Sequence, residues 1–136
     1  MTDTGTEAHS SRPSILCDAS VEIAESETAT IGILWRLSET GRQIDANLVQ
    51  LAPQQHIDVH AEPDLDVLIV VMDGTGDLRA GNLTMRLAEG LVVWLPRGSS
   101  RSLGAGDQGL AYFSVHRRRP GIQIGLKPPP AMTSLE

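Results

Sequence analysis

The sequence predicts an all-β domain, built as a sandwich or barrel of short strands, and two observations carry this prediction. Turn signals rich in Gly, Asn, Asp and Pro recur along the chain and leave stretches of about 4–9 residues between them, a length typical of strands and too short for ordinary helices. Apolar and polar residues alternate in several of these stretches, as in a strand with one buried face. We therefore expect tight turns between short strands and no helix of any length.

The chain of 136 residues suits a single domain. Residues 1–13 are small and polar and predict a flexible lead, whereas residues 127–136 are rich in proline and predict a flexible tail. The barrel itself is expected over residues 14–126. The alternation is clearest in residues 30–37 and 82–87. The apolar faces there consist of Ile31, Ile33, Trp35 and Leu37 in the first stretch and of Leu83, Met85 and Leu87 in the second.

Two other stretches, residues 67–72 and 91–95, are apolar on both faces of an extended chain. Strands of this kind are usually covered on both sides. In a small all-β domain a second subunit often supplies the outer cover, so we expect a homodimer. The competing interpretation is a local cover from the N-terminal strands.

Charge and composition exclude several classes of partner. The net charge of −6 disfavours nucleic acid. Residues 1–96 hold five arginines against fifteen carboxylates, whereas residues 117–119 are all arginine. Because neighbouring side chains alternate in a strand, we expect these arginines to pair with the acidic part of the domain rather than to bind phosphate.

Three further features of the sequence favour a cytoplasmic protein with no membrane partner. The longest apolar run has six residues, which is far too short to span a bilayer. The first residues lack the charge and the apolar stretch of a signal peptide. Cys17 is the single cysteine and has no intrachain partner for a disulfide.

Two sets of residues in the middle of the chain have a distinctive spacing. The first set is Gln54, His60, Glu62, Asp66 and Gly74, and the second is Gly90, Pro96, Gly98, Arg101 and Ala105. Over residues 44–117, they resemble the two motifs of the cupin superfamily, G(X)5HXH(X)3-4E(X)6G and G(X)5PXG(X)2H(X)3N. The resemblance implies a cupin-like jelly-roll β-barrel with a site inside one mouth.

The family usually places three histidines and one glutamate on a metal ion in that mouth. Here His60 stands at the first histidine position, Glu62 at the second, Asp66 at the glutamate position and Arg101 at the last histidine position. The residues around them add a further pattern, since His56, Asp58, His60 and Glu62 alternate with apolar neighbours. In an extended strand these four side chains share one face, which either lines a wet mouth or lies in water.

If that face points inward, two hypotheses compete. In the first, His60, Glu62 and Asp66, with His56 as a further candidate, hold iron, manganese, nickel or zinc in a metal-dependent oxygenase, isomerase or lyase. Arg101 argues against this, because a guanidinium has no lone pair to donate and adds positive charge beside a cation.

In the second hypothesis, Arg101 takes the place of the metal and neutralises Glu62 and Asp66. We favour this version, a barrel that binds a small polar or anionic ligand without a cofactor. The ligand-binding residues would be His56, His60, Glu62, Asp66 and Arg101. A late strand adds Tyr112, Ser114 and His116 on one shared face, which either lines the pocket or meets solvent.

Overall fold

The computed structural model describes residues 11–27 and 31–119, apart from the side chains of Val59 and His60. Most of the predicted lead, residues 120–126 and the whole predicted tail therefore lie outside the described residues. In the described part of the chain, no helix has the length and apolar character needed to cross a bilayer. The elements are α1 (Ala19–Glu25), β1 (Gly32–Arg36), β2 (Ile44–Leu51), β3 (His56–Ala61), β4 (Val67–Ala80), β5 (Leu83–Ala88), β6 (Val92–Leu95) and β7 (Ser100–Arg117).

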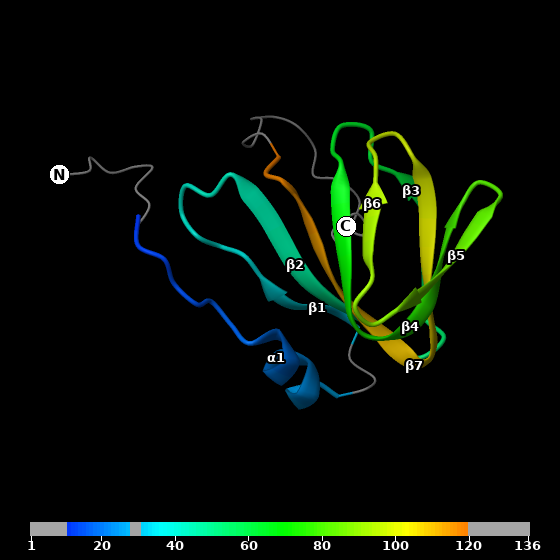
Figure 1. Cartoon of the computed structure of the whole chain (residues 1–136), viewed down its shortest axis with the longest axis horizontal. Coiled ribbons are helices and arrows are strands. Elements are labelled where there is room, and N and C mark those ends of the chain that lie inside the picture. Colours follow the sequence, from blue (N-terminus) through cyan, green and yellow to red (C-terminus); the bar gives the residue numbers. More distant parts are fainter. Residues whose placement is uncertain (1–10, 28–30, 120–136) are drawn as a thin grey trace.

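Two long antiparallel strands, β4 and β7, organise the fold. They pair with each other along most of their length, and the remaining strands pair beside them in the order β1-β2-β7-β4-β5, with β3 on β7 and β6 on β4. Figure 1 shows both long strands bending at the bottom of the view, so that each contributes to two sheets. One sheet is β1-β2-β7-β4-β6 and the other is β3-β7-β4-β5. The predicted all-β jelly-roll architecture is confirmed.

The core lies between the two sheets and is aliphatic, as the composition predicts. Alternate residues of each strand point into it, because successive side chains of a strand leave on opposite faces. The buried core consists of Val49, Leu51, Ile57, Val67, Ile69, Val71, Leu78, Leu87, Leu95, Leu103, Ala105, Leu110 and Tyr112.

The bend in the long strands depends on glycine. Gly74 has a φ of 84°, which is unfavourable for other residues. A Cβ atom at this position would also collide with the backbone carbonyl of Gly109 in β7. Gly74 is the last residue of the first cupin-like motif, and this backbone geometry explains why a glycine stands there.

The prediction that the chain contains no helix was wrong. Asp18 caps α1, its carboxylate accepting from the backbone amides of Ser20 (3.0 Å) and Val21 (3.3 Å). Asp is among the best helix caps because it satisfies amides that have no partner within the helix. With seven residues, the helix is shorter than the periodic pattern needed to detect it.

Within this chain, the two stretches predicted to be covered on both faces are covered on one face, and cover by a second subunit stays a prediction. In β4, Val67, Ile69 and Val71 are buried, whereas Leu68 between them is exposed on the outer face. In β6, Trp94 is exposed in the same way. No described segment covers the β6 side of this outer face.

Candidate functional site

Arg101 is the most deeply buried charged residue in the described part of the chain. Its exposed fraction is 1%. It shares the inward face of β7 with Leu103 and Ala105, which are the next two residues on that face. Its Nη1 donates to the backbone carbonyl of Ser99 at 3.3 Å. A guanidinium removed from water must be compensated by opposite charge or by hydrogen bonds. The motif position expected to carry the last histidine therefore places a permanent positive charge inside the barrel mouth.

Glu62 lies at the rim of the mouth, directly after β3, and is also buried. Its carboxylate accepts from Nη2 of Arg119 at 2.7 Å and from the backbone amide of Asp64 at 3.3 Å. Its backbone carbonyl accepts from the amide of Gly98 at 2.7 Å, which joins the turns of the two motifs. The pairing of Glu62 with Arg119 agrees with the expectation that the arginine run contacts the acidic part of the domain.

The charge state of Glu62 follows from these contacts. Burial by itself raises the pKa of this carboxyl, but the hydrogen bonds from Arg119 and Asp64 and the positive charges of Arg119 and Arg101 together hold the pKa below its usual value of 4.5. Glu62 is therefore an anion at neutral pH, held between two guanidinium groups.

Asp66 does not join this group. Its carboxylate accepts from the backbone amide of Arg97 at 2.9 Å and from Nη1 of the same residue at 3.1 Å. Arg97 thus hydrogen-bonds Asp66 and Arg119 hydrogen-bonds Glu62, while the charge of Arg101 also lowers the pKa of Glu62. The expected neutralisation of both acids by Arg101 stays a prediction.

A β-bulge divides the polar row expected along residues 56–62. In the pairing of β3 with β7, Ile57 lies opposite Leu103 and His60 opposite Arg101, with a register shift between the two pairs. One extra residue in β3 breaks the strict alternation. His60 is thus placed at the register position of Arg101, while its side chain lies outside the described residues. His56 is exposed on the outer face and lies away from the mouth.

The polar face of β7 near its end points inward, a direction that the sequence did not decide. Tyr112 and Ser114 are fully buried and His116 nearly so. The Nδ1 atom of His116 lies 2.8 Å from the backbone carbonyl of Arg117. The Ser114 Oγ has no hydrogen-bond partner among the described residues. These side chains extend the polar interior beyond the motif positions.

The described residues do not fit the metal-ion site that is usual in the family. Among their side chains, no group of three or more His, Cys, Asp or Glu residues is arranged to hold a metal. The Glu62 and Asp66 carboxylates are bonded to Arg119 and Arg97, and Arg101 occupies a ligand position with a cation.

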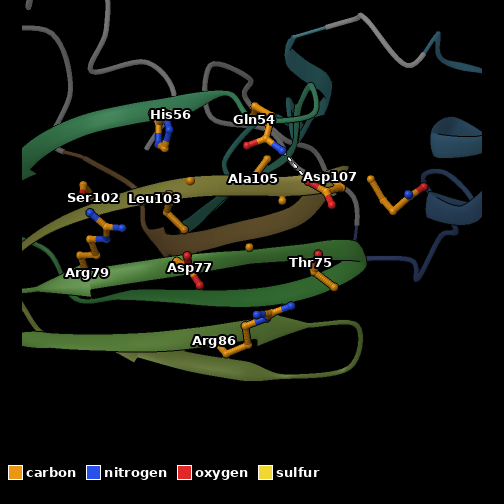
Figure 2. Close-up of a pocket in the computed structure, with 14 residues that line it drawn as sticks. Gln54, His56, Thr75, Asp77, Arg79, Arg86, Ser102, Leu103, Ala105 and Asp107 are labelled. Carbon is orange, nitrogen blue, oxygen red and sulfur yellow. Dashed lines mark hydrogen bonds between the residues drawn. The ribbon is translucent and has the colours of Figure 1, made fainter.

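A second candidate site is a groove of about 590 Å³ on the outer face of the β3-β7-β4-β5 sheet. Figure 2 shows His56 and Gln54 on one side of this groove and Arg79, Asp77 and Arg86 on the other. Pairing across the strands explains the hollow, since Gly104 stands between His56 on β3 and Asp77 on β4 and offers no side chain.

The His56 ring fills part of that space. A Cβ on Gly104 would lie 2.7 Å from the Nδ1 of His56, so the ring lies across the glycine backbone. Gln54 donates to Asp107 and closes one end of the groove (Figure 2). Gln54 also has a φ of 68°, a conformation that glycine adopts more readily. The sequence prediction missed this groove because its walls come from distant parts of the chain.

Comparisons with known proteins agree with the architecture. Neither a scan against protein-family models nor a search of curated proteins finds a match. Among solved structures, a protein from Bacillus halodurans aligns over 86% of this chain and 89% of its own, with a TM-score of 0.62 and 18% identity. The cupin domain of Schizosaccharomyces pombe Cnp3 aligns over 62% of this chain, with a TM-score of 0.56 and 16% identity.

A third solved structure is a sugar phosphate isomerase of the cupin superfamily from Silicibacter pomeroyi, aligned over 58% of this chain with a TM-score of 0.53 and 20% identity. This chain spans 59% of the Cnp3 structure and 53% of the isomerase. At such identities the likeness concerns the fold. The protein has the fold of the cupin superfamily. The motif resemblance, not the likeness of folds, places Arg101 at a usual ligand position.

Proposed function

We propose that this cupin-fold domain binds a small polar anion in its mouth, through Arg101 and without a bound metal ion. The observation that carries the proposal is the burial of Arg101 on the inward face of β7. A buried guanidinium presents a permanent positive charge and several hydrogen-bond donors to the interior, which suits an anionic group.

The local charge supports an anion rather than a cation. Arg101 and Arg119 bring two positive charges to the described part of the mouth, and Glu62 brings one negative charge. Asp66 is matched by Arg97 at the rim. The guanidinium of Arg101 belongs to this set, and a guanidinium suits an anionic ligand better than a cation.

Hydrogen-bonding capacity supports a polar ligand. A guanidinium presents five donors in a planar fork and suits carboxylate and phosphate groups. The buried Ser114 hydroxyl faces the same interior and would supply a further donor or acceptor. The outer groove is the weaker candidate, since its arginines are exposed and already solvated.

The alternative is a metal-dependent enzyme with His60, Glu62 and Asp66 as ligands. It requires Asp66 to leave Arg97 and Glu62 to leave Arg119, and a cation to bind beside Arg101. We therefore favour metal-free ligand binding.

We also place the protein in the cytoplasm, since its single cysteine, Cys17, allows no intrachain disulfide.

Titration calorimetry with inorganic phosphate and glucose 6-phosphate tests the proposal, with glucose as the uncharged control. A sugar phosphate is a suitable probe because it joins an anion to hydroxyl groups, and a structure of similar fold is a sugar phosphate isomerase. We expect the phosphorylated probes to bind and Arg101→Gln to weaken binding at least about tenfold, the loss of one charged hydrogen bond.

The matched control is Arg86→Gln, which removes the same charge from the outer groove and should leave binding unchanged. Arg101→Lys keeps the charge and loses the fork, so partial binding is expected if Arg101→Gln does not fold. Loss of binding in Arg86→Gln alone would move the site to the groove. Near-stoichiometric iron, nickel, manganese or zinc in the purified protein would contradict the metal-free proposal.

A further inference from the structure

The rim of the barrel mouth is charged on one side and apolar on another. The charged side lies at the turns of the two motifs, where Glu62 pairs with Arg119. The apolar side is the end of the β4-β5 hairpin, which lies at the right of the view in Figure 1. Two large apolar residues of β5 are uncovered there, Leu83 with an exposed fraction of 57% and Met85 with 38%. We call these two residues the apolar lip.

Alternation along β5 places the apolar lip on the inward face of the sheet. Leu83, Met85 and Leu87 share one face of the strand, whereas Thr84 and Arg86 lie on the other. Leu87 is buried in the core. The apolar lip therefore continues the inward face of β5 beyond the part that the core covers, and it is not an ordinary feature of the outer surface.

Strand pairing brings the apolar lip into the same row of side chains as Arg101. Arg79 of β4 lies opposite Ser102 of β7, so the same register sets Ala80 beside Arg101. Ala80 in turn lies opposite Leu83 of β5. Two strand spacings separate Arg101 from Leu83, a distance of about 10 Å between their backbones. The small side chain of Ala80 fills little of this distance.

The neighbouring row of the same sheet is apolar throughout its described part. Met85 lies opposite Leu78, and Leu78 lies opposite Leu103 on β7. Leu78 and Leu103 are buried, whereas Met85 is partly exposed. An apolar surface thus runs from the core to the rim of the mouth, directly beside the row that holds the buried guanidinium.

We propose that the anion bound in the mouth is amphiphilic, with its charged head on Arg101 and an aliphatic group packed on the apolar lip. This inference rests on the proposed function, because Arg101 is the anchor for the head. Ligand pockets are usually lined by apolar side chains with a few polar groups that fix the orientation. The ligand class is a phosphate or carboxylate attached to a saturated carbon chain.

The chemistry of the apolar lip favours a saturated chain over a ring. Leu83 and Met85 are both aliphatic, and the lip has no aromatic side chain on which a planar ring would stack. Methionine is unbranched and adapts to apolar groups of different shape. Each methylene group that leaves water on binding should tighten the affinity about threefold to fourfold.

Titration calorimetry with methyl, butyl and hexyl phosphate tests the proposal, and acetate with heptanoate shows whether a carboxylate head serves as well. We expect hexyl phosphate to bind at least about 30-fold more tightly than methyl phosphate. The double substitution Leu83→Ser and Met85→Ser should reduce this gain to less than about threefold. The matched control is Leu91→Ser, which removes a side chain of similar exposure, 44%, between β5 and β6 and should keep the full gain.

The possible results separate this inference from the proposed function. Equal affinities for methyl and hexyl phosphate would overturn the amphiphilic ligand and leave the anion site intact. No binding of any phosphate or carboxylate would overturn both. A gain with chain length that survives the double substitution would overturn the apolar lip as the contact. Unchanged affinity for hexyl phosphate in Arg101→Gln, or in Arg101→Lys if the first variant does not fold, would overturn the position of the head.

The methyl group of Met85 gives a second measurement at the apolar lip itself. Its NMR signal should shift in a saturable way with hexyl phosphate and stay in place with methyl phosphate. A soluble paramagnetic agent should broaden this signal in the ligand-free protein, because Met85 is partly exposed. A signal that is already protected there would identify another segment or a second copy as the cover, and would overturn the proposal.

Discussion

The barrel mouth and the outer groove hold similar side chains in opposite surroundings. Each combines arginines, an acid and a histidine, but Arg101, Glu62 and His116 at the mouth are buried, whereas Arg79 and Arg86 in the groove are exposed. An exposed charge is solvated and gains little from its neighbours, with a typical pair contributing about 0–1 kcal/mol. A buried charge requires compensation by the structure around it.

The size of a hollow therefore says little about how tightly its side chains are constrained. The groove has about 590 Å³ of space, yet its exposed arginines are solvated as they would be elsewhere on the surface. At the mouth, three arginines are arranged around two acids with a defined partner for each acid.

The largest difference is expected when an arginine is truncated in each region. Arg101→Ala removes a fully buried side chain and should lower the free energy of unfolding by about 3 kcal/mol, as for other large buried side chains. Arg86→Ala removes an exposed one and should change it by less than about 0.5 kcal/mol. Urea denaturation followed by circular dichroism measures both. Equal effects would mean that burial does not distinguish the two regions.

A smaller difference is expected from the acids. Glu62→Gln should lower the free energy of unfolding at pH 7 by about 1 kcal/mol, because it weakens a part-buried hydrogen bond between two charged groups. Asp77→Asn in the groove should have little effect, since the carboxylate is partly exposed.

The dependence of unfolding on pH gives a second test of Glu62. The folded pKa of Glu62 lies below its usual value, so its stabilisation is complete above that value and is lost as the pH falls through the folded pKa. Unfolding of Glu62→Gln should therefore depend less steeply on pH in acid than unfolding of the wild type. Identical acid curves for Glu62→Gln and the wild type would contradict the described environment of Glu62.

The smallest effect is expected at the floor of the groove. Gly104→Ala would place a Cβ 2.7 Å from Nδ1 of His56, but that ring is exposed and can rotate away. We expect a loss of less than about 1 kcal/mol and a change in the NMR shifts of His56. A loss as large as that of Arg101→Ala would show that the groove is as tightly constrained as the mouth.

The strands and motif turns were predictable because their signals are local. Alternation of apolar residues indicates a strand, and Gly74 occupies a backbone conformation that glycine favours. The helix α1 was missed because its main local signal, the cap at Asp18, is followed by only seven helical residues. A cap without a long periodic stretch predicts little.

The inward direction of Arg101 was predictable, but the partners of the neighbouring acids were not. Arg101 enters the mouth because alternation in β7 places it inward beside Leu103. The partner of Asp66 is Arg97, 31 residues away, and the bulge in β3 moves His56 out of the polar row. Both depend on the register between distant strands, which a single sequence does not reveal.

The most direct test is to locate a bound anion residue by residue. Backbone amide NMR spectra of the wild-type protein, titrated with glucose 6-phosphate, report the surroundings of each amide. We predict saturable shifts centred on Ser99, Arg101 and Ser114 at the mouth, with Gly104 and Gly106 in the groove unchanged. Shifts confined to the groove, or no saturable shifts with any phosphorylated probe, would contradict the claim that the buried arginine serves a ligand.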